Sequence, residues 1–204
     1  MTSPTPINLA VEDDLSEAVL RKILSDRYVV GVCHKHGGFG YLKSNIDGFN
    51  NASKRMPFLV LTDLDLAECA PTLIKKWLSD PIHHNLLFRV AVREVESWVL
   101  ADRDRFAKFL GIRKTLVPEN VDAIDDPKKC LINLARKSKR NLREDIVPAR
   151  RSTAKQGPDY NGRLIYFVEE FWNPREAMHN SPSLARTIKA VENFQPEWDR
   201  STRG

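Results

Sequence analysis

The chain has 204 residues, of which 42% are hydrophobic and 29% are charged, so wholesale disorder is excluded and one substantial domain is expected. Three scattered cysteines without CxxC spacing exclude a disulfide framework and a zinc ribbon, and they predict a cytoplasmic protein. No apolar run approaches about 18 residues, so no membrane span is expected. The segment Met1–Pro6 lacks the basic and apolar regions of a signal peptide.

The first half of the sequence alternates short apolar runs with segments of helical spacing. The runs predict strands and the spaced segments predict helices. The expected strands are residues 7–11, 28–33, 57–65 and 86–92, and the expected helices are residues 15–24, 41–53, 72–78 and 97–110. This order predicts an α/β protein with a Rossmann-like, mostly parallel sheet of about four strands.

The third expected strand, Pro57–Asp65, is the stretch around which the predicted fold is organised. Its apolar run Phe58–Leu61 is continuous, which is typical of a strand buried on both faces of a parallel sheet. Thr62 follows the run, and Asp63 and Asp65 come next. Because ligands of open α/β sheets bind at the carboxyl ends of the strands, we expect the functional site here.

The pattern changes after Gly111. Helical spacing continues in residues 128–140 and 183–194, whereas residues 150–162 have the composition of a loop. Residues 164–168 fit either a strand or a helix. The second half therefore predicts a mainly helical structure.

Charge is distributed unevenly along the chain, whose formal net charge is +5. Between Lys128 and Lys155 ten Lys and Arg residues face two acids, so this segment carries +8 and the remainder sums to −3. Such asymmetry suits a metal-binding acidic centre beside a phosphate-binding flank. We therefore expect a catalytic core over residues 1–112 and a helical, basic extension over residues 113–204 that packs on the core.

Three groups of acids fall at the ends of expected strands: Glu12, the pair Asp63 and Asp65, and the pair Glu94 and Glu96. Adjacent parallel strands lie about 4.8 Å apart, so their ends can bring carboxylates around one or two cations. A few hard oxygen ligands suit Mg²⁺ or Mn²⁺, which polarises a phosphate and lowers the pKa of a bound water. We expect Asp63, Asp65 and Glu96 as ligands and Glu12 as a ligand or a general acid/base. The alternatives are a helix-capping surface loop for the Asp pair and a solvent-facing Glu94.

Basic residues of the second half are the expected phosphate contacts. A cation beside a scissile phosphate stabilises charge that develops in the transition state, and we expect Lys155 to act in this way. The alternative for Lys155 is an ordinary exposed lysine. The other bases either track the phosphates of a nucleic acid or form a solvated helix face. These bases are Lys128, Lys129, Arg136, Lys137, Lys139, Arg140, Arg143, Arg150 and Arg151.

The histidines and tryptophans are expected to be structural. His34 and His36 have a spacing that can bind zinc, but no third ligand lies nearby in the sequence, which favours a loop role. The tryptophans are expected to pack in the core and not to stack on bases; they are Trp77, Trp98, Trp172 and Trp198.

Two motifs resemble the TOPRIM domain, the Mg²⁺-dependent catalytic fold of topoisomerases, bacterial primases and small nucleases of the OLD type. They are Val11–Asp14 after the first strand and Leu61–Asp65 after the third. The family pattern is a Glu after the first strand and Asp-x-Asp after the third. The resemblance therefore implies Glu12 as acid/base or ligand, with Asp63 and Asp65 as metal ligands. The chain departs from the pattern at Asp13, where the family usually has glycine.

Further stretches resemble a TOPRIM-like bacterial family that is often encoded near ATPases. They are Gly38–Leu42, Thr62–Asp65 with Cys69 and Pro71, Glu96–Asp102, Lys155–Asn161 and Ser181–Leu184. The resemblance implies a metal-dependent nuclease that acts on DNA or RNA in phage defence, with an AAA- or ABC-type ATPase as partner. A homo-oligomer is left open.

Two other classes of function stay open on the sequence. The acids after the first strand and Thr62–Leu66 also resemble the acid cluster and phosphoacceptor strand of a signalling receiver domain, although the long basic second half is unusual for that class. The other alternative is a non-catalytic adaptor that binds nucleic acid and an ATPase. A topoisomerase would need a separate gate domain, and a primase would need a zinc module that the cysteines exclude.

Overall fold

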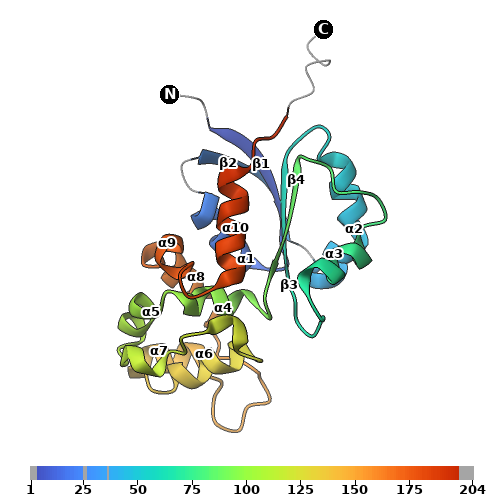
Figure 1. Ribbon diagram of the computed structural model, residues 1–204. Helices are drawn as coiled ribbons and strands as arrows, with labels where there is room; N and C mark the ends of the chain where they lie inside the picture. Colours follow the sequence, from blue (N-terminus) through green and yellow to red (C-terminus); the bar gives the residue numbers. More distant parts are fainter. Residues whose placement is uncertain (1–3, 25–26, 36, 198–204) are drawn as a thin grey trace. The chain divides into compact units, whose positions relative to one another are not determined.

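The structure is a computed structural model that describes residues 4–24, 27–35 and 37–197 (Figure 1). The expectations for Met1–Ser3, His36 and Trp198 concern positions outside these residues. Contacts within the chain divide it into two compact units. The sheet unit takes its described residues from 4–90 and 187–197, and the helical unit consists of residues 91–186. This division differs from the expected boundary after residue 112.

The sheet unit is built on four parallel strands in the order β2-β1-β3-β4. The strands are β1 (Thr5–Ala10), β2 (Tyr28–His34), β3 (Phe58–Asp63) and β4 (Leu86–Ala91). The predicted α/β class with a parallel sheet of about four strands is confirmed. The continuous apolar run of β3 explains its central place, because Phe58 to Leu61 are at most 4% exposed.

Helices cover both faces of this sheet. They are α1 (Asp14–Leu24), α2 (Gly38–Ala52), α3 (Ala70–Trp77) and, from Thr187 onward, the last turns of α10 (Pro182–Asn193). Figure 1 shows α2 and α3 on one face and α1 with the end of α10 on the other. Tyr28 joins α10 to the sheet, because its hydroxyl lies 3.0 Å from the carbonyl oxygens of both Val191 and Phe194.

The strand order creates a switch point between β1 and β3. The chain moves outward from β1 to β2, and α2 then carries it back past β1 to β3. From β3 the chain continues through α3 to β4 on the other side. The connections that leave the carboxyl ends of β1 and β3 therefore run in opposite directions, which opens a crevice there. In open α/β sheets this crevice is where ligands bind.

The helical unit contains short helices around two buried tryptophans. Trp98 and Trp172 are at most 1% exposed, and the indole N–H of Trp172 donates to the Trp98 carbonyl oxygen at 3.0 Å. Between β4 and α10 the chain forms α4 (Val95–Ala101), α5 (Arg103–Leu110), two 3₁₀ turns (Lys114–Leu116 and Val121–Ala123), α6 (Pro127–Ala135), α7 (Arg140–Ile146), α8 (Tyr160–Glu170) and α9 (Pro174–Ala177).

Two expectations about helices are corrected here. Residues 97–110 form two helices and not one, because Asp102 leaves the helical conformation with φ −82° and ψ 66°. Its buried carboxylate accepts from Asn173 N at 2.8 Å and caps α5 through Arg105 N at 3.5 Å. The ambiguous residues 164–168 are helical and lie within α8. In the described part of the chain, none of the helices has the length and apolar character needed to cross a membrane.

A charged cluster at the start of α1 makes the stability of the sheet unit depend on pH. Glu17 receives hydrogen bonds from Lys35 at 2.7 Å and Arg21 at 2.8 Å. Burial acts to raise the pKa of Glu17, but these two cations outweigh it and hold the pKa below its ordinary value of 4.5. A carboxylate of this kind stabilises the fold fully above pH 4.5, and its contribution is lost as the pH falls through the lower folded pKa.

We expect Glu17→Gln to lower the free energy of unfolding by about 0.5–1 kcal/mol at pH 7, since both cations are partly exposed and screened by solvent. Below the folded pKa, where Glu17 of the wild type is also neutral, the difference should vanish. Urea unfolding of both proteins at a series of pH values measures this. An equal difference at pH 7 and pH 3 would contradict the assignment.

Candidate functional site

Glu12 occupies the crevice between the carboxyl ends of β1 and β3. Its Oε1 atom accepts the hydroxyl of Thr62 at 2.5 Å and the backbone N–H of Asp63 at 2.9 Å. One carboxylate oxygen thus fastens the end of β1 to the end of β3. Thr62 is 1% exposed, so its hydroxyl needs this partner.

Asp13 and Asp14 have structural partners at the start of α1. The Asp13 carboxylate accepts the backbone N–H of Ser16 at 2.8 Å, as a helix cap does. Asp14 is exposed and pairs with Lys35 at 2.6 Å. Of the three consecutive acids, Glu12 is therefore the one whose side chain turns to β3.

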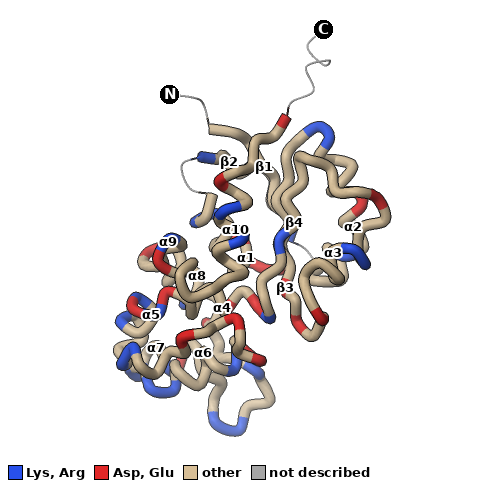
Figure 2. The backbone as a smooth tube through the Cα atoms, in the orientation of Figure 1, with Lys and Arg blue, Asp and Glu red and all other residues tan. Residues whose placement is uncertain are grey.

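Asp63 and Asp65 stand beside Glu12 on the β3 side of the crevice. Asp63 is the last residue of β3, and Asp65 lies in a tight turn closed by Ala67 N–H to the Leu64 carbonyl oxygen at 2.9 Å. Asp65 has φ +48°, a conformation that short polar side chains tolerate better than most. Figure 2 shows acidic positions gathered at this end of β3.

The crevice favours a proton or a cation on its carboxylates. Burial is the strongest influence on Glu12 and raises its pKa, while the hydrogen bonds from Thr62 and Asp63 act in the opposite direction. The carboxylates of Asp65 and Asp13 add a further rise, and the pKa of Glu12 lies above its ordinary value. The carboxylates of Glu12, Asp13 and Asp65 therefore lie close together, and Glu12 among them is partly shielded from water.

A Mg²⁺ or Mn²⁺ ion is compatible with these donors. Residues 4–24, 27–35 and 37–197 contain no group of three or more His, Cys, Asp and Glu side chains placed to hold a metal ion. Mg²⁺ needs fewer protein ligands than that, because it uses one or two carboxylates and completes its shell with water and substrate phosphate. Asp63 and Asp65 supply two carboxylates, and a cation would offset the charge that raises the pKa of Glu12.

The other expected metal ligand and its neighbour belong to the helical unit. Glu96 is 3% exposed; its Oε1 accepts from the Tyr160 hydroxyl at 3.1 Å and lies 3.3 Å from Lys128 Nζ. Glu94 is half-buried, and its carboxylate accepts the backbone N–H of Lys128 at 2.9 Å, so it caps α6. Glu94 is thus partly exposed, and its carboxylate has a structural partner. Metal binding by Glu96 stays a prediction.

Seven of the ten expected phosphate contacts line two adjoining pockets of the helical unit. The first pocket, of about 500 Å³, is lined by Lys128, Lys129, Arg136 and Lys155 together with Glu94 and Asp126. The second, of about 770 Å³, is lined by Arg136, Arg143, Arg150 and Arg151. Arg136 and Pro148 belong to both, so the two form one basic surface.

Lys137, Lys139 and Arg140 line neither pocket, although all three are exposed. Arg140 pairs instead with Glu144 at 2.8 Å. Arg143, which lies three residues after Arg140 on α7, lines the second pocket.

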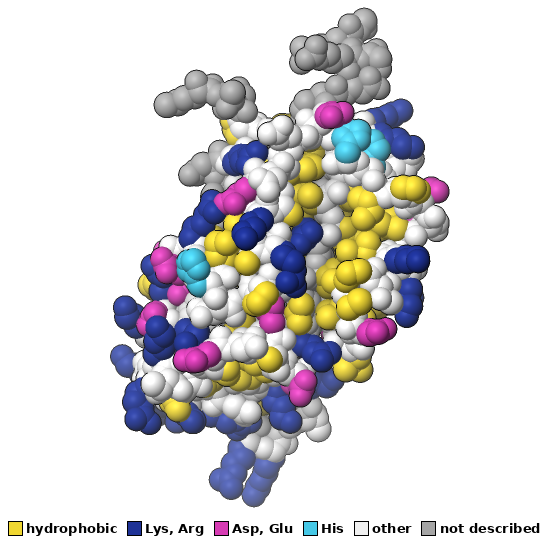
Figure 3. All heavy atoms as spheres, in the orientation of Figure 1, with side chains coloured by type: hydrophobic (Ala, Val, Ile, Leu, Met, Phe, Trp, Pro, Cys, Tyr) yellow, Lys and Arg dark blue, Asp and Glu magenta, His cyan; other side chains and the backbone are white. Residues whose placement is uncertain are grey.

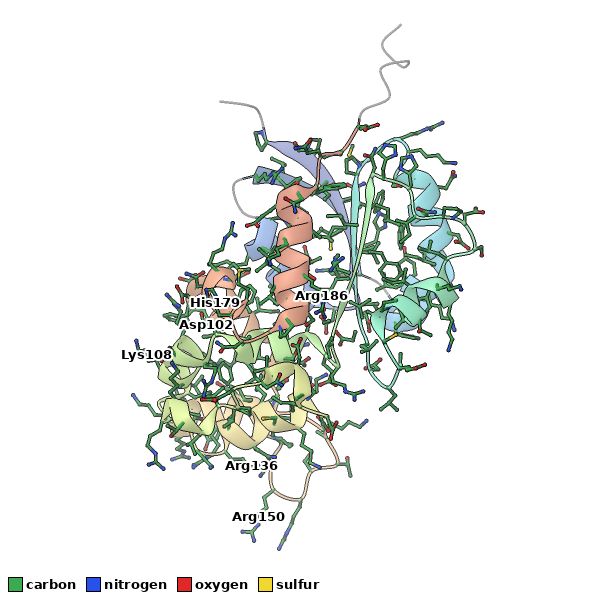
Figure 4. All side chains as sticks on the ribbon, in the orientation of Figure 1. Asp102, Lys108, Arg136, Arg150, His179 and Arg186 are labelled. Atoms are coloured by element: carbon green, nitrogen blue, oxygen red, sulfur yellow. The ribbon has the colours of Figure 1, made fainter. Side chains whose placement is uncertain are left out.

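The loop that carries Arg150, Arg151 and Lys155 is tied at both ends. Gly157 N–H donates to the Ile146 carbonyl oxygen at 2.9 Å, and Arg163 pairs with Asp145 at 2.6 Å. The loop between α7 and α8 therefore starts and finishes at the same place, and its basic tip projects from the unit (Figure 4, where Arg136 and Arg150 are labelled). Figure 2 shows the Lys and Arg positions along α6, α7 and this loop.

The remaining expectations concern the aromatic residues. His34 lies against Phe49 and Phe58, with ring centroids 5.3 and 5.9 Å away, which agrees with a structural role. Trp77, Trp98 and Trp172 are at most 8% exposed and pack in the core as expected.

Comparison with protein-family models, with curated proteins and with solved structures finds no match to this chain. The TOPRIM resemblance therefore stays a prediction. The structure itself defines an α/β protein with a carboxylate site at the switch point of its sheet and a basic surface in a separate helical unit.

The anchoring of the basic loop leads to a prediction about Gly157. A Cβ atom at this position would lie 2.3 Å from the backbone oxygen of Asp145 and 2.6 Å from the carbonyl carbon of Ile146. Because backbone atoms cannot yield as a flexible side chain does, we expect Gly157→Ala to destabilise the helical unit by about 1–3 kcal/mol. Urea unfolding followed by tryptophan fluorescence measures this.

Gly48→Ala is the control, because no atom lies within 4 Å of the added Cβ and Gly48 is in α2. Alanine at an open helix position should be neutral or stabilising by up to about 1 kcal/mol. Equal stabilities of Gly157→Ala and the wild type would show that the loop is not held as described.

Proposed function

We propose that the chain is a divalent-metal-dependent nuclease that hydrolyses phosphodiester bonds of DNA or RNA. The observation that carries the proposal is the half-buried Glu12 carboxylate, which Thr62 and Asp63 hold by hydrogen bonds at the switch point of the sheet, with Asp65 close enough to raise its pKa. Paired acids at this edge suit metal-assisted attack of water on a phosphate.

In this proposal Asp63 and Asp65 would hold Mg²⁺ or Mn²⁺, which would neutralise charge at the phosphate and make a bound water more acidic. Glu12 acts as the general base that accepts the proton of the attacking water. Both of its hydrogen bonds end on Oε1, so Oε2 is the atom placed to accept a proton from the attacking water. Because a cation at Asp65 would offset the rise in pKa that comes from the neighbouring acids, the basicity of Glu12 in this proposal rests on its burial, which is the largest cause of its raised pKa.

The basic surface of the helical unit binds the phosphates of the nucleic acid. Arg136 is central to it, since it lines both pockets, and Lys128, Lys129, Lys155, Arg150 and Arg151 surround it. Electrostatic contacts of this kind hold a nucleic acid without reading its sequence. The catalytic role of Lys155, the AAA- or ABC-type ATPase partner and the phage-defence setting stay predictions that rest on the sequence.

The first experiment compares wild type and Asp63→Asn on plasmid DNA and structured RNA with Mg²⁺, Mn²⁺ or EDTA. We expect cleavage that requires the metal and falls on the order of 100-fold or more in the variant, because a metal ligand is lost. Asp80→Asn is the matched control, since Asp80 is an exposed acid that precedes β4 at the opposite edge of the sheet. Equal activity of Asp63→Asn and Asp80→Asn would contradict the proposal.

The second experiment tests the basic surface by binding. We expect Arg136→Ala to weaken binding of DNA or RNA and to reduce the slope of log affinity against log salt concentration by about 1, because one phosphate contact is lost. Arg113→Ala is the control, since Arg113 is exposed in the same unit and lines neither pocket. The interpretation fails if both variants bind like the wild type at every salt concentration.

A receiver domain is the second candidate, because Asp63 ends β3 beside Glu12 and Asp13. A phosphoacceptor aspartate in such a place would take a phosphoryl group from acetyl phosphate. A mass gain that disappears in Asp63→Asn, without any nuclease activity, would favour this candidate over the nuclease.

A further inference from the structure

A pocket of about 270 Å³ opens beside the carboxylate site in the sheet unit. Three segments line it: the start of α2 with Phe39, the turn after β3 with Asp65 and Leu66, and α3 with Lys76 and Trp77. All three begin at the carboxyl edge of the sheet, where α/β proteins bind their ligands. Figure 3 shows apolar side chains gathered on the surface over α2 and α3.

The pocket offers an aromatic ring that is both held and accessible. Phe39 is 38% exposed, while Trp77 behind it is only 8% exposed. Their ring centroids lie 4.9 Å apart at 84°, an edge-to-face contact that fixes the Phe39 ring. Aromatic rings fixed in this way form the platforms on which unpaired bases stack.

A second apolar side chain stands at the mouth of the pocket. Leu66 is 95% exposed, in the same tight turn that gives Asp65 its φ of +48°. The turn therefore holds a large apolar side chain in water beside Phe39. Covering both with a flat ligand removes apolar surface from water at a favourable rate of roughly 25 cal/mol per Å².

The polar groups of the pocket match a nucleotide. Lys76 supplies a positive charge for a phosphate, and Asp65 and Glu68 supply carboxylates that can accept N–H groups of a base. Asp65 also belongs to the carboxylate site, so a base in the pocket places its own phosphate next to the acids. The small volume suits one base and not a peptide helix, which needs a long groove.

We propose that the pocket formed by Phe39, Leu66 and Trp77 binds one unpaired base of a single-stranded nucleic acid whose adjoining phosphate lies at the carboxylates. The inference rests on the proposed nuclease function and narrows its substrate to DNA or RNA with unpaired nucleotides. A base inside a duplex cannot enter, because it would first have to leave the stack.

The test measures binding without cleavage. Fluorescence anisotropy in EDTA compares an oligothymidylate with an oligonucleotide of equal length that consists of abasic sites, for wild type, Phe39→Ala and Phe171→Ala. Phe171 is a matched control, since it is 45% exposed but lies in the helical unit. We expect the wild type to prefer the oligothymidylate by about 10-fold, because stacking of one base contributes about 1–3 kcal/mol.

Phe39→Ala should remove this preference and leave the affinity for the abasic strand unchanged, whereas Phe171→Ala should keep both. Leu66→Ser is a second variant. Because Leu66 is 95% exposed, its substitution should not affect folding, and we expect it to reduce the preference for the oligothymidylate by roughly threefold. Circular dichroism checks that each variant is folded.

A wild type without base preference, or a Phe39→Ala and Leu66→Ser pair that keeps the preference, would overturn the inference. So would a change of sedimentation coefficient in these variants without loss of base preference, since the pocket would then be a contact between copies of the chain. The cleavage assay with Asp63→Asn decides the nuclease separately. Base preference without cleavage would support the base-binding pocket and contradict the nuclease function. Cleavage without base preference would support the nuclease function and contradict the base-binding pocket.

Discussion

A single oxygen atom, Glu12 Oε1, joins the carboxyl ends of β1 and β3 by two hydrogen bonds, and the candidate site of the sheet unit is built around this contact. A half-buried carboxylate is tolerated only when donors replace the water that it has lost, and here the donors are the hydroxyl of Thr62 and the backbone N–H of Asp63. The same contact fixes the position of Asp63, the last residue of β3, and hence the start of the turn that holds Asp65. Burial and the neighbouring acids together keep the pKa of Glu12 high, so the contact that fastens the strands also sets the chemistry of the crevice.

The two units divide the chemistry of the chain between them. The sheet unit has 13 Lys and Arg residues against 13 Asp and Glu, whereas the helical unit has 19 against 14 and so carries the whole net charge of +5. Three acids of the helical unit, Glu94, Glu96 and Asp126, have structural partners at α6. Glu94 and Asp126 cap α6 through the backbone of Lys128 and Lys129, and Glu96 is buried against Lys128 and Tyr160. Bases still outnumber acids along the two pockets, four to two in the first and four to one in the second, which suits binding to a polyanion.

Substrate choice, in the proposed function, comes from the loops and not from the sheet. The sheet supplies the fixed frame in which Glu12 and Asp63 meet, while the turn Leu64–Ala67 supplies Asp65 to the acids and Leu66 to the apolar pocket. In the two proposals, a single tight turn would thus contact both the reacting phosphate and the neighbouring base. Loops on a rigid scaffold commonly carry specificity in this way, because they can vary without disturbing the core.

The sequence by itself determined the parallel sheet of the sheet unit and predicted which acids lie at the ends of its strands. The apolar run Phe58–Leu61, followed by Thr62 and Asp63, indicates a buried strand with acids at its end, and the local pattern is enough to see that. Local pattern did not reveal the break at Asp102, because the carboxylate leaves the helix to bind Asn173, which is 71 residues away. Nor did it show that Glu96 is buried against Tyr160, 64 residues away. It also did not show that α10 packs on the sheet unit, where the Tyr28 hydroxyl of β2 binds the Val191 carbonyl oxygen. Periodicity describes neighbours along the chain, and such partners are fixed only when the whole tertiary structure packs.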